Sequence, residues 1–185
     1  LATRTSPTNI GMALLSNLSA YDFGYCSAAQ FLTRTRNTLK TLDELERHHG
    51  HFYNWYDTRS LKPLHPQYIS MVDSGNLAAN LLILRSGCQE LSEASILPRR
   101  MFAGLSDTLR VLCDVARRLD GKLVDAVFHR KIERQLEILD QAPVTLQAAH
   151  ELLADLEMEA AELSEAADCD EELAWWARTY ERSCQ

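Results

Sequence analysis

The chain has 185 residues, of which 46% are hydrophobic and 24% are charged. These fractions are typical of a soluble globular domain, and they exclude a disordered or collagen-like chain. The net charge of −7 is concentrated in residues 101–185, which carry 9 basic and 18 acidic side chains, so no nucleic-acid partner is expected.

Helical periodicity dominates the sequence, and only 7 glycines and 5 prolines interrupt it. The pattern predicts helices over residues 8–22, 27–47 and 73–92 in the first half of the chain. Ser27 is expected to cap the second helix, and Asp73 or Ser74 the third. The side chains expected to form the buried stripe of the second helix are Phe31, Leu32, Leu39, Leu42 and Leu45. The apolar residues that define the third helix are Leu77, Leu81, Leu82, Leu84 and Cys88.

Between the second and third helices, residues 50–72 lose the helical period. Two prolines and a cluster of aromatic and polar side chains predict a long ordered loop, with room for two short strands. After Pro98 the pattern becomes regularly amphipathic and predicts helices over residues 101–119, 122–140, 144–167 and 170–183. The expected fold is therefore all-α, with about seven helices and one long aromatic-rich loop.

The segment 51–59 is the most unusual in the chain, because it places four aromatic residues among an Asn, an Asp and an Arg. Aromatic rings stack on the C–H faces of sugars, and amide, carboxylate and guanidinium groups pair with vicinal hydroxyls, so this composition is typical of a carbohydrate subsite. The structural alternative is that the rings close a loop onto a helical core, with Asp57 and Arg59 as an internal ion pair. If the segment is extended, Trp55 and Tyr56 point to opposite sides, so that one faces a ligand and the other packs on the core.

Other features favour structural interpretations. Asp73 and Ser74 lie at a helix start, where acids and hydroxyls are ordinary caps, although such a start also forms a natural rim for a ligand pocket. Trp175, Trp176 and Tyr180 could form a second sugar platform, but packing of a terminal helix is favoured. The histidines at 48, 49 and 51 lack metal-site geometry, and no motif for a nucleophile or a phosphate loop occurs. No metal, cofactor or catalytic residue is therefore predicted.

Four stretches of the first 92 residues carry a family resemblance. They are Arg4-Thr-Ser-Pro-Thr-Asn-Ile-Gly11, Asp22-Phe-Gly24, Gly50-His-Phe-Tyr-Asn-Trp-Tyr-Asp-Thr58 and Val72-Asp-Ser-Gly-Asn-Leu77. In this order and spacing they resemble the glucoamylase-like transglycosylase region of bacterial cyclic β-1,2-glucan synthases. The residues after 95 resemble the variable helical stretch that follows these motifs in the family.

The resemblance implies a partial (α/α) toroid of the six-hairpin glycosidase type. The alternative all-α fold is a bundle of about seven helices. Residues 1–95 would hold the opening helices and the substrate loop, and residues 96–185 an amphipathic helical portion of the same domain. The implied ligand is β-1,2-glucan. Its expected binding residues are Asn54, Trp55, Tyr56, Asp57, Arg59 and Asp73.

The family also implies a parent transferase embedded in the bacterial inner membrane, with a glycosyltransferase portion that uses UDP-glucose and a phosphorylase-like region. The chain opens on Leu1 without a secretory leader, so we expect an excised, soluble fragment of the cytoplasmic face, with the rest of the parent as partner. The family's catalytic glutamates lie in motifs of the type GxSES and MFEYLMP, and neither occurs here. The fragment is expected to be inactive alone, because this chemistry needs two carboxyl groups flanking one bond.

A helical interaction or self-association module, with a purely structural aromatic loop, is the alternative function. A toroid cut partway through would expose apolar faces, so homo-oligomers of the isolated fragment are expected. The five cysteines are odd in number and widely spaced, which favours a reducing compartment.

Overall fold

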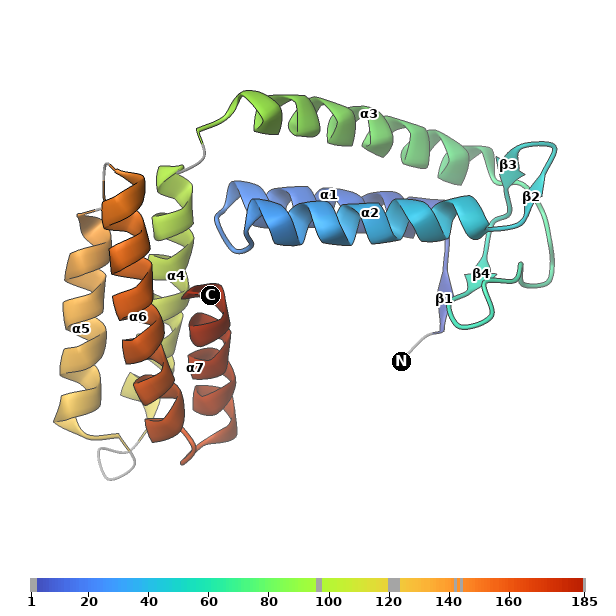
Figure 1. Cartoon of the computed structure of the whole chain (residues 1–185). Helices are drawn as coiled ribbons and strands as arrows, with labels where there is room; N and C mark the ends of the chain where they lie inside the picture. Colours follow the sequence, from blue (N-terminus) through green and yellow to red (C-terminus); the bar gives the residue numbers. More distant parts are fainter. Residues whose placement is uncertain (1–2, 96–97, 120–123, 142, 144, 185) are drawn as a thin grey trace. The chain divides into compact units, whose positions relative to one another are not determined.

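The computed structural model describes residues 3–95, 98–119, 124–141, 143 and 145–184. Within these residues the chain forms seven helices and two small antiparallel strand pairs, so the predicted all-α fold is confirmed (Figure 1). The chain divides into two compact units. The first comprises Leu1–Tyr21 and Ser27–Ala94, and the second comprises Asp22–Cys26 and Ser95–Gln185.

The first unit is built on the helices α1 (Pro7–Asp22), α2 (Ala28–Glu44) and α3 (Met71–Glu93). The predicted cap of α2 is confirmed, because the Ser27 hydroxyl accepts from the Gln30 backbone N–H while the Gln30 side chain accepts from the Ser27 N–H. The predicted buried stripe of α2 is wrong at Leu32, which is 51% exposed. Leu32 directly follows Phe31 of the inward face, and one step along a helix turns a side chain by about 100°. On α3, Leu82 is likewise 64% exposed.

The start of α3 corrects the predicted cap. Ser70 is the N-cap, and its hydroxyl accepts from the Asp73 backbone N–H at 3.2 Å. Asp73 therefore lies in the first turn of the helix instead of preceding it. A carboxylate is favourable there as well, because the helix macrodipole places partial positive charge at this end.

Helices α1 and α3 lie side by side and run parallel (Figure 1). Their contacts keep a nearly constant offset along the sequence, from Thr8 with Asp73, through Gly11 with Asn80, to Leu18 with Gly87. A Cβ atom on Gly87 would lie 2.6 Å from Leu18 Cδ2, so the missing side chain permits the close approach. The two helix N-termini therefore lie at the same end of the first unit.

Two of the four strands lie inside the predicted loop, whereas residues 47–48, at the predicted end of the second helix, form a third strand. β2 (Arg47–His48) and β3 (His51–Phe52) form a hairpin whose two central residues, His49 and Gly50, have φ of 48° and 85°. β4 (Tyr56–Asp57) instead pairs antiparallel with β1 (Arg4–Thr5), near the start of the chain. The loop packs against α2 and α3, where Leu42, Leu45, Tyr56 and Leu77 form a buried cluster. Phe52, Tyr53 and Leu61 of the loop are partly buried against it.

The second unit contains α4 (Arg99–Arg118), α5 (Ala126–Asp140), α6 (Leu146–Ala166) and α7 (Glu171–Cys184). All four contribute to one apolar core. Asp125 and Thr145 cap α5 and α6 through their side chains, and the Asp170 carboxylate accepts from the Leu173 N–H. The predicted starts at residues 122 and 144 lie outside the described residues.

Candidate functional site

Three of the four motif stretches meet at one end of the first unit. Strand pairing sets Arg4 opposite Asp57 and Thr5 opposite Tyr56. The Arg4 guanidinium lies over the Trp55 ring, 4.8 Å from its centroid, in a cation–π contact. Residues more than fifty positions apart thus share one small region, which sequence spacing alone does not show.

The N-terminal turns of α1 and α3 are joined by polar side chains. The Thr8 hydroxyl donates to Asp73 Oδ1 at 2.5 Å, and Asn76 Nδ2 donates to the Thr8 Oγ1 at 3.1 Å. Burial by itself would raise the pKa of Asp73, but hydrogen bonds from the hydroxyls of Thr8, Ser70 and Ser6 outweigh it, so the pKa lies below its ordinary value. The carboxylate is therefore ionised at neutral pH and sits where two helix N-termini meet.

Tyr56 is the core residue of the aromatic segment. It is fully buried, its hydroxyl donates to the Glu46 carbonyl at 2.7 Å, and it accepts from the Tyr53 N–H at 2.8 Å. Burial raises its pKa. Of the two neighbouring rings, Tyr56 packs on the core, whereas Trp55 is half-buried. Tyr56 therefore has no exposed surface for a sugar to stack on.

Asn54 is also buried and holds the loop together. Its backbone N–H donates to the Tyr68 carbonyl at 2.9 Å, and its side-chain oxygen accepts from the Tyr68 N–H at 3.4 Å. This pair closes the segment between residues 54 and 68 into a compact loop. Asn54 thus supports the shape of the region from inside.

Asp57 organises the turn that follows β4. Its Oδ1 accepts from the Ser60 N–H, the Ser60 hydroxyl and the Arg59 N–H at 2.7, 3.0 and 3.0 Å. These bonds, led by the Ser60 backbone N–H, lower the pKa of Asp57. Arg59 reaches Asp57 through its backbone N–H, and its side chain is exposed. Leu61 ends this turn with φ of 59°.

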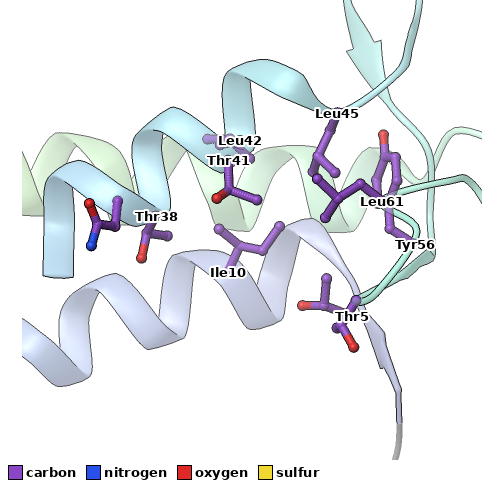
Figure 2. A pocket seen from close by; sticks show the side chains of 10 residues that line it. Thr5, Ile10, Thr38, Thr41, Leu42, Leu45, Tyr56 and Leu61 are labelled. Atoms are coloured by element: carbon purple, nitrogen blue, oxygen red, sulfur yellow. The ribbon is translucent and has the colours of Figure 1, made fainter.

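A pocket of about 310 Å³ opens beside this turn (Figure 2). Figure 2 shows Thr38 and Thr41 of α2 on one side, Ile10 of α1 below them, and Thr5, Tyr56 and Leu61 at one end. The complete lining is Thr5, Ile10, Asn37, Thr38, Thr41, Leu42, Leu45, Tyr56, Thr58 and Leu61. Its polar groups are uncharged hydroxyls and one amide above an apolar floor, which suits a neutral polar ligand.

The six predicted residues have different places in the structure. Trp55 and Asp57 lie beside β1, and Asp73 is hydrogen-bonded to Thr8. The Arg59 side chain is exposed, whereas Asn54 and Tyr56 are buried. Sequence reasoning did not single out Arg4, Thr8 and Asn76, although they lie within the quoted stretches. The threonines of the pocket carried no signal, because single threonines on a helix are common on solvated faces.

Among the described residues, no three or more His, Cys, Asp or Glu side chains are gathered closely enough to hold a metal ion. The described helices also include none with the length and apolar character that a membrane span requires.

Over 154 residues, or 82% of its length, the chain is 38% identical to the cyclic beta-(1,2)-glucan synthase NdvB of Rhizobium meliloti (strain 1021). The chain is similar to a segment of a cyclic β-1,2-glucan synthase. The predicted resemblance to cyclic β-1,2-glucan synthases is thereby confirmed. The chain spans 5% of the length of this synthase, and no family model matches it.

Proposed function

We propose that the chain binds β-1,2-glucan as one portion of a larger cyclic β-1,2-glucan synthase, and that it contributes substrate-binding residues to a region of glycosyl transfer and cyclisation. The similarity to NdvB supports this assignment. Both compact units would be portions of one glucoamylase-like domain. The parent would lie in the bacterial inner membrane with this portion at its cytoplasmic face.

The observation that carries the proposal is the convergence of three motif stretches at the shared N-terminal end of α1 and α3. Asp73, Thr8 and Asn76 form a hydrogen-bonded cluster there. Sugar hydroxyls donate well to an ionised carboxylate and accept from an amide, so this cluster can hold a polyol.

The six predicted residues take different parts in the proposal. Trp55, Asp57, Arg59 and Asp73 keep exposed surface and would contact the glucan. Arg4 covers one part of the Trp55 ring and fixes its orientation. Asn54 and Tyr56 would act from inside by holding the loop in shape, since their polar groups bond to Tyr68 and to the Glu46 and Tyr53 backbone.

The test is calorimetric titration of the chain with linear β-1,2-gluco-oligosaccharides. Asp73→Asn should weaken binding about ten-fold, because it removes a charge-assisted acceptor of nearly the same size. Asp43→Asn is the matched control, since Asp43 is an exposed carboxylate of α2 paired with Arg47. Equal affinities of the two variants and the parent chain would refute the assignment of Asp73. The chain is expected to show no hydrolysis or transfer of glucan by itself.

One observation favours the alternative of a self-association module. Val72, Leu82 and Ile83 are all exposed on α3, and such side chains in water tend to find a partner. Light scattering over a range of concentrations distinguishes the functions. A dimer that Leu82→Glu dissociates, together with no binding of oligosaccharide, would favour self-association over glucan binding.

A further inference from the structure

A second group of exposed rings lies in the second unit. Phe23, Tyr25 and Trp175 are 63%, 51% and 52% exposed. The rings form two pairs, Phe23 with Tyr25 at 5.9 Å between centroids and Trp175 with Trp176 at 4.7 Å. Single exposed rings are common on protein surfaces, whereas exposed rings that gather in one patch indicate a site for a ligand or a partner.

A pocket of about 340 Å³ joins the two ring pairs. Tyr25 and Trp176 both line it, so each pair contributes one ring. The other lining residues are Asp107, Thr108 and Val111 of α4 and Thr179 and Ser183 of α7. The pocket lining thus combines two aromatic rings, one of them a phenol, with a carboxylate and three aliphatic hydroxyls.

A close backbone contact holds Tyr25 in this place. The Gly24 carbonyl oxygen lies where a Cβ on Gly104 would be, with only 2.2 Å between them. Glycine at position 104 therefore lets residues 22–26 lie directly on α4. Gly24, the residue before Tyr25, packs on α4, and this contact holds Tyr25 beside the pocket.

The polar lining favours a ligand that donates hydrogen bonds. Thr108, Thr179 and Ser183 each donate their hydroxyl proton to a backbone carbonyl of their own helix, at 3.0, 2.8 and 2.9 Å. Their oxygens remain as acceptors, although Thr179 already accepts from Arg182. Asp107 adds a carboxylate, one oxygen of which accepts from Arg110 at 3.2 Å. Acceptors beside aromatic faces match a polyol on a sugar ring.

An apolar protein segment fits the pocket less well. It would cover the aromatic rings, but it would also take the Asp107–Arg110 pair out of water without returning hydrogen bonds to it. A sugar covers the same rings and supplies hydroxyl donors to the carboxylate. The chemistry therefore favours a carbohydrate occupant.

We propose that the pocket lined by Tyr25, Asp107, Thr108 and Trp176 is a second carbohydrate-binding site, which takes one glucopyranosyl unit of a neutral glucan. The β-1,2 linkage of that glucan rests on the proposed function. The site itself rests on its own lining residues. It would let the second unit hold a glucan chain independently of the cluster at Asp73.

The two sites can be followed separately in one experiment. The three tryptophans are Trp55, Trp175 and Trp176. Labelling the whole chain with 5-fluorotryptophan gives each a fluorine resonance, assigned by single Trp→Phe variants. During titration with sophorose, the disaccharide of two β-1,2-linked glucose units, the Trp176 resonance should shift in a saturable way.

Two pairs of variants test the contacts. Asp107→Asn should weaken the affinity read from Trp176 about ten-fold, since it removes a charged acceptor. The matched control is Asp114→Asn, because Asp114 pairs with Arg117 on the same helix at the same spacing, and its effect should stay within about two-fold. Thr108→Val keeps the shape of the side chain and should also weaken binding, without altering the response of Trp55.

Three outcomes would overturn the proposal. A Trp55 response without any Trp176 response, to sophorose or to cellobiose, refutes the second site and leaves the proposed function intact. If the affinity read from Trp176 is equal in Asp107→Asn, Asp114→Asn and the parent chain, the sugar binds near Trp176 without using Asp107, and the assigned site is wrong. Broadening of Trp176 with protein concentration alone identifies a second protein copy as the occupant. A Trp176 response to cellobiose alone supports the site and contradicts the β-1,2 assignment.

Discussion

The two units of this chain are both helical, yet they are stabilised in different ways. The 20-residue α4 buries nine of its residues, whereas the 23-residue α3 buries two, Leu77 and Leu84. The second unit thus depends on apolar burial among four amphipathic helices. The first unit depends more on hydrogen bonds between distant segments, such as those of Thr8 with Asp73 and Asn54 with Tyr68. Secondary structure content alone hides this difference.

The largest expected effect concerns apolar burial. Leu109→Ala in the core of the second unit should lower the free energy of unfolding by about 3 kcal/mol, because it removes a fully buried side chain and leaves a cavity. Leu82→Ala on α3 should change it by no more than about 0.5 kcal/mol, because that side chain is largely exposed. Urea unfolding measures both. Equal losses would remove the contrast between the units.

A smaller loss is expected from the buried hydroxyl of the first unit. Tyr56→Phe keeps the ring but leaves the Tyr53 N–H and the Glu46 carbonyl without their partner. The free energy of unfolding should fall by about 1 to 3 kcal/mol. Tyr53→Phe, in the neighbouring ring, is the control. A neutral Tyr56→Phe would show that water replaces these hydrogen bonds.

The Asp73 cluster should stabilise the chain in a pH-dependent way. The pKa of Asp73 is lowered in the folded state, so its contribution is present above the unfolded pKa and is lost as the pH falls through the folded value. Asp73→Asn should therefore cost roughly 1 kcal/mol at pH 7 and less near pH 3. Thermal melts of both proteins across this range test it. A difference that grows toward low pH would contradict the lowered pKa.

The smallest effect is expected in the β2–β3 hairpin. His49 has φ of 48° ahead of Gly50, the arrangement of a type I′ turn, in which Asn-Gly is preferred. His49→Asn should raise the free energy of unfolding by about 0.5 kcal/mol, because Asn tolerates the left-handed region better. Gly50→Ala should lower it, since Gly50 has φ of 85°. A melting temperature that falls with His49→Asn would indicate an unrecognised role for the imidazole.

The sequence predicted the helices well, because their apolar periodicity is local information. The cap of α3 was not predictable in the same way. Ser70, Asp73 and Ser74 can each cap a helix, and the structure uses Ser70 while Asp73 bonds to Thr8. That choice depends on a partner 65 positions away.

The candidate site was predictable in its residue types and only partly in its geometry. The unusual composition of 51–59 identified the segment, and the extended backbone explains why Tyr56 is buried and Trp55 is not. The pairing of β1 with β4 was missed, because two-residue strands have no periodicity to detect. The pockets were missed because their lining residues come from separate elements, such as Thr5 of β1, Ile10 of α1 and Thr38 of α2 in the first pocket.

The parallel arrangement of α1 and α3 has a consequence for how such a site can diversify. Because α2 returns the chain to the end where α1 begins, residues 45–70 connect α2 to α3 at that same end. Insertions or substitutions in this connection change the surface beside Asp73 while leaving the glycine contacts farther along α1 and α3 in place. Ligand preference and helix packing are thereby encoded in separate stretches of the sequence, and each can vary without the other.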